Sequence, residues 1–147
     1  PQSQYLPHNY TSSNCIAYTG THDNDTIKGW VYSLDKKTLK FCKKYLKVKK
    51  KKNLPWALIE LTWSTVSEIA VAQIQDFLDI DSSGRMNTPS TVGKNWQYRT
   101  HHSDFSNVLA EKIYSLNALY NRLELPEKTE EVQSVENPVE DDIVSTT

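Results

Sequence analysis

The 147-residue chain carries 17 basic and 18 acidic side chains, and its formal net charge at pH 7 is −1. A chain of this length ordinarily forms one domain with a hydrophobic core. No apolar run approaches the length of a membrane span and no signal-peptide pattern opens the sequence, so we expect a cytoplasmic protein without a membrane partner.

The cysteines and the first residues of the sequence allow two further expectations. Cys15 and Cys42 are far apart and lack the spacing of a metal or redox site, so we expect reduced thiols. The sequence opens with Pro-Gln-Ser-Gln and has no initial methionine. We therefore interpret it as part of a longer protein.

The charges are segregated along the chain. Lysines crowd positions 36–52, where Asp35 is the one nearby acid, and eight acids follow position 123 against Lys128 alone. A basic stripe attracts phosphates, but this one has no interleaved arginines or stacking aromatics on its charged side. We interpret the lysines as a solvated face, expect no nucleic-acid partner, and predict an acidic, disordered tail over 124–147.

The apolar pattern predicts elements of both kinds. In chain order we expect a loop over 1–14, a strand at 15–18, helices over 25–33, 36–48 and 55–64, a strand over 68–74, a long loop over 77–102 and a helix over 104–123. Asp35 and Asn53 are expected helix caps, with Pro55 inside the first turn of the third helix. This order predicts an α/β fold.

Helical spacing also predicts which side chains face the core. Trp56 and Trp63 could stack on sugar rings, but at this spacing they fit a core better. The expected inward residues are Ile27, Trp30, Val31 and Leu34 in the first helix, Leu39, Cys42 and Leu46 in the second, Trp56, Ile59 and Trp63 in the third, and Phe105, Val108, Leu109, Ile113, Leu116 and Leu119 in the last.

A polar cluster follows the first predicted strand, where α/β proteins bind ligands. Asp25 fits a helix N-cap and Asn24 an Asx-type turn, so capping explains both. Capping does not explain His22 beside Asp23, for which a solvated strand end and a functional pair both stay open. A calcium loop fails because Ile27 stands where the next oxygen ligand would be.

Several blocks of sequence resemble one enzyme family. These blocks are Tyr5–Tyr10, Tyr18–Thr26 followed by Gly29-Trp30, Gln75-Asp76, Ser83–Pro89, and Asn95-Trp96 through Arg99. In this order they closely resemble the motifs of the amylomaltases, the 4-α-glucanotransferases of glycoside hydrolase family 77 in the α-amylase clan. The resemblance covers about residues 1–123, and Gln73, Ser90 and Tyr98 depart from the usual pattern.

The resemblance implies a fold and a reaction. It implies the C-terminal portion of a (β/α)₈ barrel, in which the ends of both predicted strands face one mouth. It also implies a retaining transfer of an α-1,4-glucan segment, whose nucleophile and acid/base lie on earlier strands outside this chain. Asp23 would then stabilise the transition state, and strands outside the chain would pair with residues 15–18 and 69–74.

The resemblance further implies the partners and the site residues. The partners are a maltooligosaccharide donor, an acceptor and the missing N-terminal part of the barrel, with neither a cofactor nor a metal. His22 would donate to the same sugar as Asp23. The other substrate-binding candidates are Asn24, Gln75, Asp76, Arg85, Asn87, Asn95 and Trp96. A non-catalytic glucan-binding remnant and a basic interaction module remain alternatives, and a plastid location would apply to a photosynthetic eukaryote.

Overall fold

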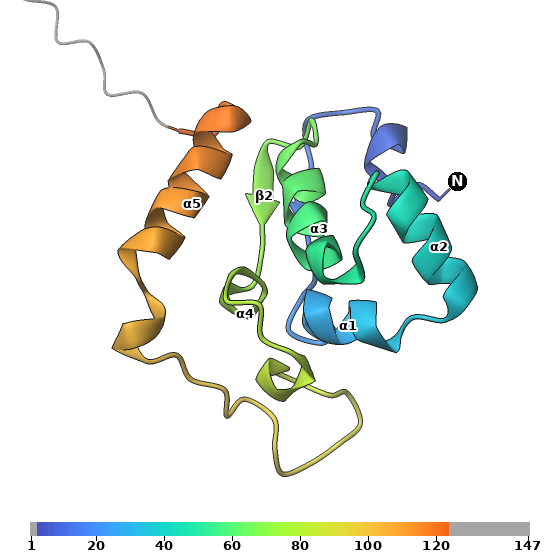
Figure 1. Cartoon of the computed structure of the whole chain (residues 1–147). Helices are drawn as coiled ribbons and strands as arrows, with labels where there is room; N and C mark the ends of the chain where they lie inside the picture. Colours follow the sequence, from blue (N-terminus) through green and yellow to red (C-terminus); the bar gives the residue numbers. More distant parts are fainter. Residues whose placement is uncertain (1–2, 124–147) are drawn as a thin grey trace, which may run out of the picture.

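The computed structural model describes residues 3–123, which form two short strands and several helices (Figure 1). The elements are η1 (Pro7–Asn9), β1 (Ile16–Tyr18), α1 (Ile27–Ser33), α2 (Lys36–Tyr45), η2 (Lys51–Asn53), α3 (Leu54–Trp63), β2 (Ile69–Val71), α4 (Ile74–Phe77), η3 (Ser82–Gly84), η4 (His102–Asp104) and α5 (Asn107–Leu119), where η denotes a 3₁₀ helix. The predicted α/β class and element order are confirmed. The predicted tail lies outside the described residues.

The two strands form a parallel pair. Ile16 pairs with Ile69, and Tyr18 pairs with Val71. Each strand thus has one neighbour within the chain, and the expectation that strands outside the chain also pair with them stays a prediction. The predicted second strand was too long, because β1 ends at Tyr18 and the chain turns into α4 at Ile74.

Four helices, α1, α2, α3 and α5, bury a common core. Its buried members are Ile27, Val31, Cys42, Leu54, Ile59, Trp63 and Leu116. Apolar residues four apart, such as Ile27 and Val31, share one helix face and can be buried together. Trp30 is 41% exposed and Trp56 is half-buried, so the predicted inward faces of α1 and α3 are confirmed in part.

The ends of the first two helices follow from local hydrogen bonding. Asp35 caps α2 as predicted, accepting from the backbone N–H groups of Lys37 and Thr38. That helix ends at Tyr45 rather than at 48, because Lys47 takes a left-handed φ of 55° and the Val48 N–H returns to the Lys43 carbonyl.

Two expected side-chain caps are not formed. Thr26 rather than Asp25 caps α1, since the Thr26 hydroxyl accepts from the Gly29 N–H at 3.1 Å. Asn53 stands at the N-cap position of α3, but its side chain makes no cap hydrogen bond. In α5 the cap is Ser106, whose hydroxyl accepts from the Leu109 N–H. Serine, threonine and aspartate are all good caps, so spacing alone does not choose among neighbours.

The last helix lies beyond β2, away from α1 and α2 (Figure 1). Leu116 is buried, but Phe105, Val108 and Leu119 are exposed, which corrects the predicted inner face. Near the C-terminal end of this helix, Asn117 accepts from the Trp63 indole N–H at 2.9 Å. This helix therefore contacts the core through one short stretch.

The cysteines and the helix lengths complete the description of the fold. Both cysteines are free, as predicted, and Cys42 is buried. Between residues 3 and 123, every helix is too short or too polar to cross a membrane.

Candidate functional site

The site segment begins where β1 ends and runs from Thr19 to Ile27. Its turn is held by Asn24, whose side-chain oxygen accepts from the backbone N–H of Thr21 at 2.8 Å and from the Thr21 hydroxyl at 3.1 Å. Asn24 thus bonds back along the chain, not forward as in the predicted Asx turn. Gln73, from beside β2, also donates to the Thr21 carbonyl at 3.2 Å.

His22 and Asp23 project from this turn as a pair. Nε2 of His22 lies 3.3 Å from Oδ1 of Asp23, and their side chains are 55% and 49% exposed. Capping does not use either side chain. A carboxylate and an imidazole at the carboxyl end of a strand are free to contact a ligand.

A distant loop adds polar groups to this pair. Asn87 donates from Nδ2 to Asp23 Oδ1 at 2.6 Å, and its backbone N–H donates to the His22 carbonyl at 3.0 Å. Arg85 donates from Nη2 to the Asp23 carbonyl at 2.7 Å and from Nε to the Asn87 carbonyl at 3.0 Å. The structure therefore brings four of the predicted site residues together.

Trp96 and Asn95 complete the loop in different ways. The Trp96 ring lies 5.0 Å from the His22 ring, centroid to centroid, and is 54% exposed. Asn95 instead folds the loop, because its side chain accepts from the Thr88 N–H and donates to the Thr91 carbonyl. Trp96 thus borders the His22–Asp23 pair, whereas Asn95 gives the loop its shape.

Gln75 and Asp76 lie beneath the site and are only 3% and 4% exposed. Gln75 donates from Nε2 to the Gly84 carbonyl at 3.0 Å. Asp76 accepts from the Thr19 hydroxyl and from the Ile27 N–H, both at 2.8 Å. Burial raises the pKa of Asp76, and these hydrogen bonds oppose the rise. Such burial does not suit the predicted contact with sugar.

Sequence reasoning missed two contributors, Ser82 and Thr19. The Ser82 hydroxyl donates to Asp25 Oδ2 at 2.7 Å, and this pair lies directly against Gly29. A Cβ on Gly29 would lie 2.6 Å from that carboxylate oxygen and against the hydroxyl. The glycine four residues after Asp25 was the available sign that something packs closely there.

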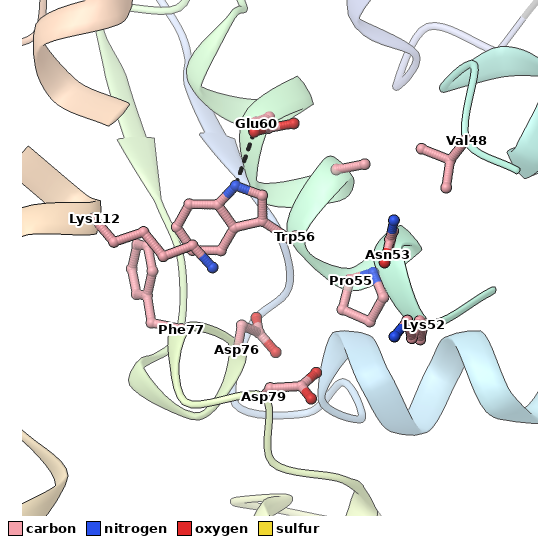
Figure 2. A pocket seen from close by; sticks show the side chains of 11 residues that line it. Val48, Lys52, Asn53, Pro55, Trp56, Glu60, Asp76, Phe77, Asp79 and Lys112 are labelled. Atoms are coloured by element: carbon pink, nitrogen blue, oxygen red, sulfur yellow. Dashed lines mark hydrogen bonds between the residues drawn. The ribbon is translucent and has the colours of Figure 1, made fainter. Parts of the chain in front are cut away.

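Two cavities flank the site without enclosing its His22–Asp23 pair. One, of about 750 Å³, runs along β1 and α3 and reaches Gly20 and Asn24. The other, of about 530 Å³, lies between α3, α4 and α5. Figure 2 shows the second, where the Lys112 ammonium lies 3.3 Å from the centroid of the Trp56 ring and the indole N–H donates to Glu60.

Within residues 3–123, there is no group of three histidine, cysteine or acidic side chains that could hold a metal ion. The ionisable groups of the site are one imidazole, one guanidinium and carboxylates in a hydrogen-bonded frame. Such groups suit a polar ligand rich in hydroxyls.

A comparison with known protein families identifies the family of the chain. A family model described as 4-alpha-glucanotransferase matches residues 1–106. The chain belongs to the 4-α-glucanotransferase family. The 4-alpha-glucanotransferase of Clostridium butyricum is 43% identical over 121 residues, covering 82% of this chain and 25% of that protein. The chloroplastic/amyloplastic 4-alpha-glucanotransferase of Arabidopsis thaliana is 39% identical over 122 residues, covering 81% and 21%.

A solved structure of the 4-α-glucanotransferase family has the same arrangement. The amylomaltase from Streptococcus agalactiae in complex with acarbose superposes with a TM-score of 0.78 at 34% identity. The match covers 82% of this chain and 24% of the amylomaltase chain. The chain thus spans about a quarter or less of the length of these family members.

Proposed function

We propose that the chain is the C-terminal part of a 4-α-glucanotransferase and carries one of its three catalytic carboxylates, Asp23. The observation that carries the proposal is the exposed His22–Asp23 pair, with Asn87 and Arg85 bonded to it, in a chain of this family. The full enzyme moves an α-1,4-glucan segment from a maltooligosaccharide donor to the 4-hydroxyl of an acceptor.

The incomplete barrel is part of the proposal. Ile16, Tyr18 and Ile69 are each about half exposed on the two strands (48%, 50% and 50%). Large apolar side chains of a parallel sheet are normally covered on both faces. We assign their cover to the missing N-terminal part of a (β/α)₈ barrel, of which residues 1–123 would be the last units and 124–147 a separate acidic segment.

The proposed mechanism is a retaining double displacement. A nucleophilic carboxylate and an acid/base, both outside this chain, form and discharge a glycosyl-enzyme intermediate. Asp23 does not attack: its carboxylate accepts hydrogen bonds from hydroxyls of the sugar at the cleaved bond, and these bonds strengthen as that ring approaches an oxocarbenium ion. His22 donates to the same sugar.

The loop residues have supporting parts in this proposal. Asn87 and Arg85 fix the orientation of Asp23 before the sugar arrives, so less reorganisation is needed in the transition state. Trp96 offers an exposed aromatic ring on which a sugar can stack beside His22. Asn24 and Asn95 shape the turn and the loop. The burial of Gln75 and Asp76 leads us to exclude direct sugar contact for both.

The test uses the full-length protein and maltotriose as both donor and acceptor. Transfer yields glucose and a ladder of longer maltodextrins, whereas hydrolysis yields no ladder. The Asp23→Asn variant should lose about 10³-fold or more in kcat, the scale of removing one transition-state contact of a charged group. A variant with Lys49–Lys52 changed to serine is the control. Normal transfer by Asp23→Asn would overturn the proposal.

A further inference from the structure

The structure assigns Asp76 as a positioning residue: one buried carboxylate holds both ends of the segment that presents Asp23, an inference that rests on the proposed function. Oδ2 accepts from the Thr19 hydroxyl where β1 ends, and Oδ1 accepts from the Ile27 N–H where α1 begins. Each distance is 2.8 Å. His22 and Asp23 lie on the turn between these two anchors.

The same short helix holds the other half of the site. Gln75, next to Asp76 in α4, donates to the Gly84 carbonyl just before Arg85. A Cβ on Gly84 would lie 3.2 Å from Gln75 Cγ, so the backbone there sits tightly on this helix. Two adjacent buried side chains, Gln75 and Asp76, therefore fix the distance between the turn that carries Asp23 and the loop segment 85–87.

Burial gives these contacts their weight. Asp76 is 4% exposed, and every buried side-chain nitrogen and oxygen among residues 3–123 has a hydrogen-bond partner. Removing the carboxylate would leave the Ile27 N–H and the Thr19 hydroxyl buried without an acceptor. Such unsatisfied donors lower the stability of the folded protein unless the backbone moves so that they reach water. Such a movement carries Asp23 away from Asn87. A displacement near 1 Å costs a reaction on the order of 100-fold in rate.

The chemistry of the two donors predicts which replacement rescues. In Asp76→Asn the amide oxygen can accept from the Ile27 N–H, while the amide nitrogen donates to the Thr19 hydroxyl, which rotates to accept. The charge is lost but both anchors survive. In the double variant Asp76→Asn/Thr19→Val, that amide nitrogen loses its acceptor. The geometric role thus predicts near-normal activity for Asp76→Asn, and loss for the double variant.

The test compares kinetics and backbone protection in the full-length protein. Asp76→Ala should lower kcat about 100-fold and leave KM within about threefold of the parent value. Asp76→Asn/Thr19→Val should show the same loss of kcat. Asp76→Asn should stay within about fivefold of the parent. Asp35→Ala is the control, since it removes a carboxylate that accepts two backbone hydrogen bonds at the start of α2 and bonds only to Lys37 and Thr38.

Hydrogen exchange read by mass spectrometry tests the anchors without activity. Amides of residues 20–27 should exchange at least about tenfold faster in Asp76→Ala than in the parent or in Asp35→Ala. Unchanged exchange there, or a normal kcat for Asp76→Ala, would overturn the inference. A parent protein that transfers no glucan refutes the proposed function instead, and the exchange experiment still decides the role of Asp76.

Discussion

Asn87 donates a 2.6 Å hydrogen bond to the carboxylate of Asp23, although 64 positions separate the two residues. The bond joins the turn after β1 to the loop after η3, and Arg85 reinforces it by donating to the Asp23 carbonyl. The carboxylate is therefore held in one orientation before any ligand arrives. In an enzyme, orientation fixed in advance lowers the cost of reaching the transition state.

The first prediction concerns this bond. Asn87→Ala in the full-length protein should lower kcat for maltotriose about 10–100-fold, because a hydrogen bond to a charged group is worth about 1.5–3 kcal/mol. Asn87→Asp should be worse, since two carboxylates would face each other. Asn53→Ala is the control, because Asn53 makes no side-chain cap contact. Equal kcat in Asn87→Ala and Asn53→Ala would contradict the prediction.

The Asn87–Asp23 pair shows which features can be predicted from the sequence and which cannot. The strand predicted at 15–18, the core face of α1 apart from Trp30, and the Asp35 cap follow from short-range patterns, and the structure has them, with the strand at Ile16–Tyr18. The contact between Asn87 and Asp23 leaves no periodic trace, because it depends on how an irregular loop returns across the sheet. Likewise, burial of Gln75 and Asp76 depends on α4, a single turn that the apolar pattern merges with β2.

Gly29 gives a second prediction. Gly29→Ala should destabilise the protein by about 1–3 kcal/mol, because its methyl group would be forced against Asp25 and Ser82. Thermal unfolding measures the loss. Adding Ser82→Ala removes the obstructing hydroxyl, so the double variant should recover part of it. A double variant no more stable than Gly29→Ala would place the clash elsewhere.

Arg122 gives a third prediction. Its guanidinium donates to the carbonyls of Trp63, Thr65 and Ser67 at 2.9, 3.0 and 3.0 Å, so it ties the residues after α5 to the turn between α3 and β2. A lysine ammonium cannot match this planar fork. Arg122→Lys should lower stability by about 2–4 kcal/mol, the worth of one or two hydrogen bonds to a charged group.

The control for Arg122 is a second arginine with short-range contacts. Arg99 donates only to the Trp96 and Tyr98 carbonyls, three and one residues away. Arg99→Lys should therefore change the unfolding temperature little. A loss from Arg99→Lys as large as that from Arg122→Lys would show that bridging distant segments is not what stabilises the protein.

The last prediction uses pH to test the burial of Asp76. Burial raises the pKa of Asp76 in the folded protein above the ordinary value of 3.8. Between the ordinary and the raised pKa, the folded protein therefore holds more protons than the unfolded one. Stability must then fall as pH rises through this window. Asp76→Asn does not titrate, so its unfolding temperature relative to the parent should rise with pH and level off above the raised pKa. If the unfolding temperature of the parent instead rose relative to that of Asp76→Asn with rising pH, the hydrogen bonds from Thr19 and Ile27 would outweigh desolvation.

Asp35 gives the opposite sign, because hydrogen bonds from Thr38 lower its pKa. The unfolding temperature of Asp35→Asn should therefore fall relative to that of the parent as pH rises.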